Sequence, residues 1–201
     1  MTVPHPHPHP SPPSPAASPP TGRRALLAWS VLTLAPAALL RPGSALAHGP
    51  TRQKVTESIT IDAPAAAVWA RIHNFDSLKD WHPAVAESPA DKGNAEGSVR
   101  RLLLKGGGAL TETLEGHDEA GMRTSYRAED GGALPVTNYT ATLSVRADGA
   151  QKSIVEWRGA FYRGYRNNDP PPEQNDDAAV RAITGVYQSG LAHLKKLAEG
   201  R

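Results

Sequence analysis

Two neighbouring segments, 97–105 and 109–117, each carry one charged residue at a position that alternates with leucines. Arg100 alternates with leucines in the first segment and Glu112 does so in the second, and three consecutive glycines between them are typical of a hairpin. With Lys105 opposite Ala109, Leu102 faces Glu112 and Arg100 lies diagonal to it, close enough to pair. Because a buried charge is costly unless paired, we interpret the two as an ion pair that fixes the hairpin register. A polar anchor inside a ligand pocket is the alternative.

Trp81-His82-Pro83 is the second place where the residue types could do chemistry. A histidine titrates near neutral pH and could act as an acid or a base. No Ser or Cys nucleophile stands at a triad spacing from His82, so we predict no catalytic residue. A structural or solvent-exposed His82 is the simpler interpretation, and Trp81 is predicted to be a lid or core aromatic.

Aromatic residues with polar tips occur in three later elements. Tyr126, Tyr139 and Trp157 fall on the apolar faces of predicted strands, and Tyr187 falls on the apolar stripe of a predicted helix. Their hydroxyl and N–H groups need hydrogen-bond partners, which a small ligand could supply, although plain core packing is the favoured interpretation. The predicted cavity residues are Trp81, His82, Arg100, Glu112, Tyr126, Tyr139, Trp157 and Tyr187.

No metal or cofactor site is predicted. His48, His73, His82, His117 and His193 are scattered, without the spacing of a paired-ligand motif. The glycine run lacks the strand-to-helix context and the Lys-Ser/Thr ending of a phosphate loop. Weak metal binding by the alternating His-Pro run near the start, or copper binding at a new N-terminal His48, are the alternatives.

The first 47 residues do not have the composition of a folded domain. Residues 1–20 are almost wholly Pro, His, Ser and Ala. Arg23 and Arg24 precede an apolar run over 25–40, and Ala45-Leu46-Ala47 matches an export cleavage site. The apolar run is shorter than the roughly 20 residues of a membrane-spanning helix. We therefore predict export by general secretion or by a twin-arginine-like route, followed by cleavage after Ala47. The mature protein is expected to be periplasmic and to have no stable membrane anchor.

Cleavage also changes the charge. The 22 basic residues fall by three (Arg23, Arg24 and Arg41) to 19, against 20 acidic ones, for a formal net charge of −1. No basic stripe remains for nucleic acid, and a chain without cysteine forms no disulfides. Residues 48–201 are enough for one domain.

Hydrophobic periodicity divides those residues into regular elements. Asp62 is the expected cap of the first helix, with Pro64 in its first turn. Asp176 or Asp177 is expected to open the last helix, which Gly200 ends. We predict an α+β domain with a curved antiparallel sheet of about six or seven strands around one long helix. The expected strands are 54–63, 97–105, 109–117, 122–129, 136–147 and 153–163, and the expected helices are 65–75, 76–81 and 176–199.

This order resembles the helix-grip (Bet v 1/START-like) fold of the SRPBCC superfamily, which includes polyketide-cyclase-like proteins. The detail is similar to the MxaD-like branch, in the segments HGPTRQKVTESITIDAPAAAVWARI, DWHPAV, GNAEGSVRRL, LPVTNY, VEWRGAFYRGY, NNDPPPEQND and TGVYQSGL. The resemblance implies a non-enzymatic accessory that assists electron transfer between periplasmic methanol dehydrogenase and cytochrome c, or a carrier of a small hydrophobic ligand.

The superfamily also suggests an alternative, a polyketide cyclase/dehydratase-like enzyme. It would place Arg100, Glu112, His82 and Tyr139 around a small enolisable substrate. That function requires these side chains to converge on one accessible cavity.

The segment before the long helix joins a stiff connector to a cluster of aromatic and polar residues. Pro170-Pro171-Pro172 favours an extended backbone, which accounts for stiffness but not for the residues before it. Aromatics and arginines on a rigid loop are typical of docking surfaces, and a simple connector is the alternative. The predicted partner-contact residues are Tyr162, Arg163, Tyr165, Arg166, Asn167, Asn168 and Asp169.

Overall fold

The computed structural model describes residues 49–200. The predicted leader, the export signal and His48 lie outside these residues. No helix among them is long and apolar enough to cross a membrane.

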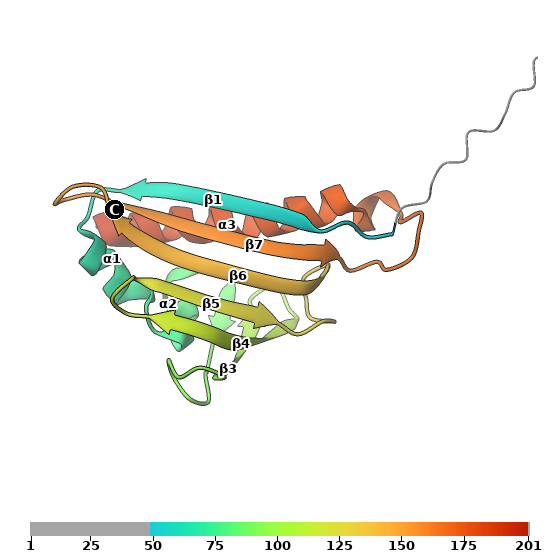
Figure 1. Ribbon diagram of the computed structural model, residues 1–201, viewed down its shortest axis with the longest axis horizontal. Coiled ribbons are helices and arrows are strands. Elements are labelled where there is room, and N and C mark those ends of the chain that lie inside the picture. The colour runs from blue at the N-terminus through green and yellow to red at the C-terminus, as the bar shows by residue number, and fades with distance from the viewer. Residues whose placement is uncertain (1–48, 201) are drawn as a thin grey trace, which may run out of the picture. The chain divides into compact units, whose positions relative to one another are not determined.

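Seven strands and three α-helices make up the described domain (Figure 1). All expected strands and helices occur. The elements 136–147, 153–163 and 176–199 have the expected bounds, the others have ends shifted by a few residues, and the helical stretch 76–81 divides into a 3₁₀ turn and α2. The elements are β1 Gln53–Ile61, α1 Ala65–Ile72, the 3₁₀ turn η1 Phe75–Ser77, α2 Leu78–Trp81, β2 Val85–Glu87, β3 Val99–Leu104, β4 Ala109–Asp118, β5 Arg123–Ala128, β6 Val136–Ala147, β7 Ser153–Arg163, the 3₁₀ turn η2 Pro172–Gln174 and α3 Asp176–Glu199.

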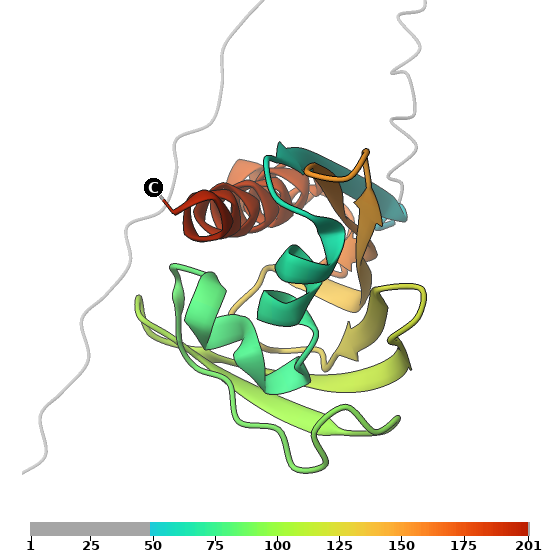
Figure 2. The same ribbon diagram turned by 90° about the vertical axis from the view of Figure 1, so that its left-hand side faces the viewer.

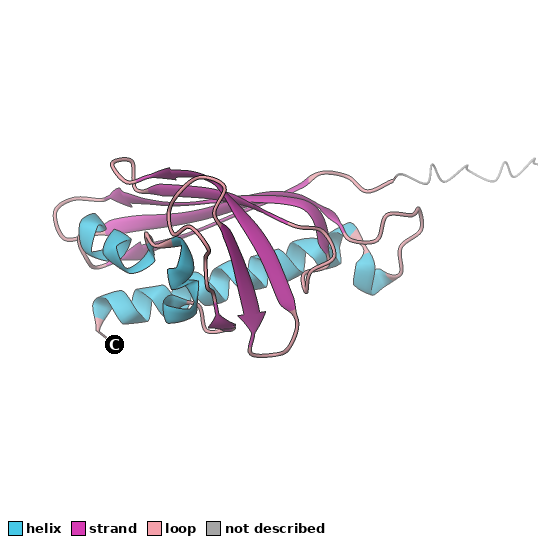
Figure 3. Ribbon diagram, turned by 90° about the horizontal axis from the view of Figure 1, so that it is seen from below, coloured by secondary structure: helices cyan, strands magenta, loops and turns pink. Residues whose placement is uncertain are grey.

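The strands form one antiparallel sheet in the order β1-β7-β6-β5-β4-β3-β2. This confirms the predicted curved antiparallel sheet, which Figure 3 shows wrapping one side of the long helix. The sequence prediction missed β2, because three residues are too few for a period of two to be recognised.

Local irregularities bend the sheet. The pairing of β4 with β5 shifts between Leu114 and Gly116, and that of β6 with β7 shifts between Thr137 and Thr140. Asn138 lies inside the second shift with a φ of 49°, in the left-handed region that asparagine tolerates. Because bulges increase strand twist and bend, these two positions help the sheet to curve around α3.

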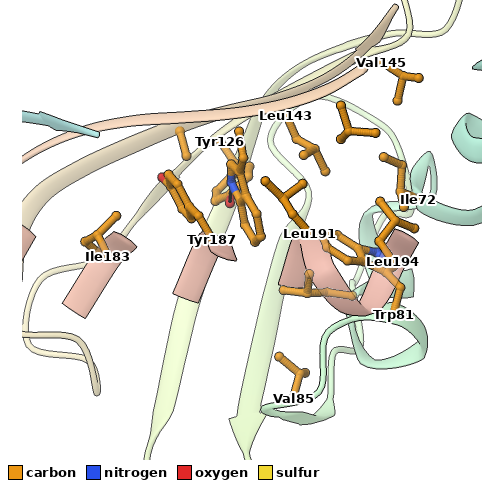
Figure 4. Close-up of a cluster of buried hydrophobic side chains, with 14 of the residues drawn as sticks. Ile72, Trp81, Val85, Tyr126, Leu143, Val145, Ile183, Tyr187, Leu191 and Leu194 are labelled. Atoms are coloured by element: carbon orange, nitrogen blue, oxygen red, sulfur yellow. Dashed lines mark hydrogen bonds between the residues drawn. The ribbon is translucent and has the colours of Figure 1, made fainter. Parts of the chain in front are cut away.

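Helix α3 lies against the concave side of the sheet, where Figure 2 shows it end-on beside β1 and β7. Its apolar side and the inward faces of the strands form the core (Figure 4). The Asn175 side chain caps the helix by accepting from the Ala178 N–H at 2.8 Å, and Gly200 ends it with a φ of 71°. Both expected ends are confirmed, because α3 begins at Asp176 and stops at Gly200. The side chain that caps it, Asn175, was not predicted.

The start of α1 also corrects an expectation. Pro64 is the N-cap and no side chain caps the helix, so Asp62 does not have the expected role. The Asp62 backbone N–H instead donates to Glu199 Oε1 at 2.9 Å, which joins the end of β1 to the end of α3. Asp62 lies just before α1 in the sequence, which suggested that it caps this helix. In the structure its backbone N–H binds a side chain 137 residues away instead.

Candidate functional site

A small cavity lies between the middle of α3, the α2 region and the strands β2 to β7. Its volume is about 70 Å³. The rim includes Leu104, Leu134 and Val186, which are half-buried, and the exposed Ala84. Most of the lining is hydrocarbon, with polar atoms from a few aromatic and ionisable side chains. The lining residues are Leu78, His82, Ala84, Val85, Leu102, Leu104, Leu110, Glu112, Tyr126, Leu134, Tyr139, Trp157 and Val186.

Arg100 and Glu112 form a buried ion pair beside this cavity. Arg100 Nε donates to Glu112 Oε2 at 2.7 Å, and the two residues are only 5% and 4% exposed. A second guanidinium nitrogen donates to the Phe75 carbonyl oxygen at 2.7 Å, and the guanidinium lies over the Phe75 ring, 4.1 Å from its centroid. The Arg100 charge is therefore neutralised, hydrogen-bonded and covered by an aromatic face.

The expected pairing of these two residues holds, but the expected register was wrong. Arg100 lies directly opposite Glu112, and Leu103 rather than Lys105 faces Ala109. The reason is the turn: the Gly107 N–H donates to the Leu104 carbonyl at 3.0 Å, so the chain reverses over four residues after β3. A shift of two residues keeps the same side chains on the same face. The predicted pairing of Arg100 with Glu112 is therefore correct although the predicted register is not.

The aromatic residues satisfy one another's polar tips. Trp157 Nε1 donates to the Tyr126 hydroxyl at 3.0 Å, and the hydroxyls of Tyr139 and Tyr187 lie 2.7 Å apart. Tyr187 also stacks on Trp157, with ring centroids 4.4 Å apart. Burial raises the pKa of Tyr126, of Tyr139 and of Tyr187. All three therefore stay as neutral phenols, and the network serves as packing with internal hydrogen bonds.

His82 is buried and both of its ring nitrogens are engaged. Nδ1 accepts from the Ala84 N–H at 3.2 Å, and Nε2 donates to the Val186 carbonyl of α3 at 3.0 Å. These partners assign the neutral Nε2–H tautomer. Burial lowers the His82 pKa, which favours the same neutral form. The side chain links the α2 region to α3 and leaves no nitrogen free to move a proton.

The eight predicted cavity residues all lie in the core, but they do not all line the same space. His82, Glu112, Tyr126, Tyr139 and Trp157 line the cavity described above. Trp81 and Arg100 line a neighbouring void of about 10 Å³. Tyr187 lines neither space and is fully buried against Trp157. The sequence prediction missed the aliphatic rim, because Leu134 lies in an irregular segment where no periodicity marks an inward-facing residue.

The predicted partner-contact loop divides into a buried anchor and an exposed part. Arg163 is only 3% exposed, donating to Asp176 Oδ1 at 3.0 Å and to the carbonyls of Tyr165 and Asn167. Arg163 is therefore not available for contact with a partner. Its guanidinium instead holds the loop against the start of α3. Tyr162 and Tyr165 are half-buried, and the exposed members are Arg166, Asn167, Asn168 and Asp169.

Two of the histidines that are scattered along the sequence meet in space. His73 follows α1 and His117 lies near the end of β4, yet their ring nitrogens and a Glu119 oxygen all lie within 4.8 Å of one another. The absence of paired-ligand spacing along the sequence therefore does not keep this pair apart in the structure. Antiparallel folding brings the end of α1 next to the turn between β4 and β5, which spacing along the chain does not reveal.

The curved seven-stranded sheet closed by one long helix defines a helix-grip domain of the Bet v 1 and cyclase type. Residues 52–199 match the model of the family described as polyketide cyclase / dehydrase and lipid transport. The chain belongs to this family.

Several solved structures share the fold. An uncharacterised protein from Bacillus thuringiensis is 28% identical with a TM-score of 0.62, over 73% of this chain and 98% of that one. The protein XoxI from Bacillus cereus is 29% identical with a TM-score of 0.61, over 72% and 94%. The ZhuI aromatase/cyclase from Streptomyces is 17% identical with a TM-score of 0.59, over 75% and 96%, which shows the fold alone. No curated protein matches this chain.

Proposed function

We propose that this domain is a non-enzymatic binding protein for a small, mainly apolar molecule, which occupies the cavity under α3. One observation carries the proposal: the cavity is lined mainly by hydrocarbon, and the polar side chains around it are already hydrogen-bonded to the protein. Within residues 49–200, the only buried side-chain nitrogen or oxygen atoms without a hydrogen-bond partner are His73 Nδ1 and Ser153 Oγ, and neither residue lines this cavity. Shape and apolar contact would therefore select the ligand.

The same geometry argues against the cyclase-like alternative. General acid–base catalysis needs a group within reach of the substrate and with a proton or lone pair to give. Both His82 nitrogens are engaged, and Arg100 and Glu112 are sealed against each other. The likeness to an aromatase/cyclase is a likeness of fold, and fold does not carry function.

Cavity size limits the ligand. An apolar cavity of about 150 Å³ holds benzene, and this cavity has about 70 Å³. A ligand of a few heavy atoms fits as the side chains stand, whereas an aromatic molecule requires Leu104, Leu134 or Val186 at the rim to move.

The test uses two indole N–H groups as NMR reporters. Trp157 lines the cavity, whereas Trp69 donates to Glu119 at 2.9 Å near the end of α1 and serves as the internal control. Titration with isobutanol and with benzene should move the Trp157 signal and leave Trp69 unchanged. A Leu110→Ala variant, which enlarges the cavity, should bind benzene at least about tenfold more tightly, as apolar cavities of sufficient size do. No Trp157 shift in either protein with either probe would contradict the proposal.

At a finer level, we infer that the domain acts in the periplasm as an MxaD-like accessory of methanol dehydrogenase and cytochrome c. Support comes from the export signal in the sequence, from the resemblance of the segments around VEWRGAFYRGY and TGVYQSGL, and from the loop that follows β7. The buried Arg163 side chain binds both Asp176 and the backbone carbonyl of Asn167. These bonds fix the backbone that carries the exposed residues Arg166 and Asn167–Asp169. A fixed loop loses little conformational entropy when it binds a partner.

Docking is tested with a double substitution of Tyr165→Ala and Arg166→Ala. Folding should be retained, because the Arg166–Asp130 ion pair is exposed and such pairs contribute about 0–1 kcal/mol. Binding of the purified protein to the dehydrogenase or cytochrome, followed by surface plasmon resonance, should weaken about tenfold or more. The control is Arg146→Ala, an exposed arginine at the opposite end of β6. If the double variant and Arg146→Ala bind the partner equally well, the loop is not part of the interface.

A further inference from the structure

A cluster of two histidines and one carboxylate lies outside the cavity, where α1 meets the turn after β4. The Glu119 oxygen Oε2 lies 3.5 Å from His73 Nδ1 and 3.0 Å from His117 Nε2. Donors on a tetrahedral Zn²⁺, at about 2.0–2.1 Å from the metal, lie about 3.3–3.4 Å apart. The two distances to Glu119 Oε2 therefore approach that spacing, and all three donor atoms lie within 4.8 Å of one another.

Neighbouring residues orient two of the three groups. His117 Nδ1 lies 3.1 Å from Thr124 Oγ1, a contact that leaves Nε2 toward Glu119, and the His117 ring stacks on Trp69. Trp69 Nε1 donates to the other Glu119 oxygen, Oε1, at 2.9 Å. Supporting hydrogen bonds of this kind are typical of metal sites, where the second ring nitrogen or second carboxylate oxygen is held by the protein.

The third group carries an unexplained polar atom. His73 Nδ1 is buried and makes no hydrogen bond within the described residues. A buried nitrogen without a hydrogen bond is costly, and the Glu119 oxygen 3.5 Å away does not provide one. An imidazole lone pair is a strong ligand for a transition metal. His73 is also the C-cap residue of α1, where the helix dipole favours a positive charge.

We propose that His73, His117 and Glu119 bind a divalent transition metal of the Zn²⁺ type. Two imidazoles and one carboxylate match its ligand preferences better than those of Mg²⁺ or Ca²⁺, which prefer all-oxygen sites. The Glu119 side chain is 62% exposed, so solvent has access to the remaining coordination position. The ion joins α1 to the β4–β5 turn, at a place separate from the cavity under α3.

Metal titrations of the whole chain test this site. Zn²⁺ binding is measured by calorimetry, and Co²⁺ binding by the visible absorption of a tetrahedral ion. The histidines near the start of the chain are present in every variant, so their contribution appears as a common background. Glu119→Gln and His73→Asn should each abolish the Co²⁺ absorption that this cluster adds to the background. Each should also weaken Zn²⁺ binding at the cluster by more than 100-fold. Thr124→Val, which removes only a supporting contact, should weaken it about 10–100-fold.

The matched control is Glu115→Gln, an exposed carboxylate on β4, the strand that also carries His117; Glu115 pairs with Arg127. It should bind both metals as the unaltered chain does. Both test positions are partly exposed, with side-chain exposures of 62% for Glu119 and 30% for His73, and circular dichroism verifies that the variants fold. If Glu119→Gln and His73→Asn titrate like Glu115→Gln, the cluster is only a group of ion pairs and the proposal is overturned.

Discussion

Replacing Arg100 with methionine should lower the free energy of unfolding by about 3–5 kcal/mol, because the substitution leaves an unpaired carboxylate in the core. Glu112 is 4% exposed, and its direct charged partner is Arg100 at 2.7 Å. Methionine fills much of the volume of the arginine stem, so the loss measures charge more than packing. Urea unfolding followed by tryptophan fluorescence provides the value.

Two controls separate the buried charge from other causes. The double variant Arg100→Met, Glu112→Leu removes both charges and should recover most of the lost stability, since a buried pair contributes little compared with apolar residues. Arg127→Met breaks the exposed pair with Glu115 and should cost about 0–1 kcal/mol. A single Arg100 variant as stable as the Arg127 variant would contradict the assignment.

The double variant also decides between the two interpretations of the pair. If it folds and its Trp157 signal still responds to isobutanol, Arg100 and Glu112 serve the hairpin structure. If it folds and the response is lost, the pair anchors the ligand, because Glu112 lines the cavity.

Gly190→Ala should destabilise the domain by about 1–3 kcal/mol, although alanine is the better helix former by about 1 kcal/mol. A Cβ at this position would lie 2.5 Å from His82 Cδ2 and 3.0 Å from Trp157 Cζ3. Both neighbours are buried, and His82 is held by hydrogen bonds to Ala84 and Val186. Relief of the overlap therefore requires α3 to move away from the α2 region. Thermal unfolding followed by circular dichroism measures the effect.

The matched control lies five residues earlier on the same helix. Gly185 is exposed and a Cβ there would meet nothing within 4 Å. Gly185→Ala should therefore raise stability by up to about 1 kcal/mol through helix propensity alone. Opposite signs for the two substitutions would establish the close approach of α3 to His82 and Trp157, whereas a stabilising Gly190→Ala would exclude it.

Much of the fold was predictable because it depends on short-range patterns. Alternation along 136–147 and 153–163 reproduces the bounds of β6 and β7, and the 3–4 spacing of 176–199 reproduces those of α3. Gly200 as the helix end follows from local backbone preference alone. The match of these local signals to the observed elements is expected where local preference and tertiary packing agree.

The candidate site was predictable in residue type but not in arrangement. Opposite charges on two leucine-rich faces predicted that Arg100 and Glu112 pair, and this prediction holds both in the expected register and in the observed one, which differs by two residues. Sequence could not state that Leu134 and Val186 reach the cavity rim, or that its volume is only about 70 Å³. Those properties depend on how side chains from distant segments fill the space between sheet and helix.

The sequence by itself thus determined the order of elements, the family resemblance and the need to pair the buried charges. Only the tertiary structure decided that Arg163 is an anchor and not a surface residue, and that His73 and His117 meet at Glu119. The physical reason is the range of the interactions. Periodicity and capping act over a few residues. Which distant side chains share a site depends instead on strand register, bulges and the position of α3 against the sheet.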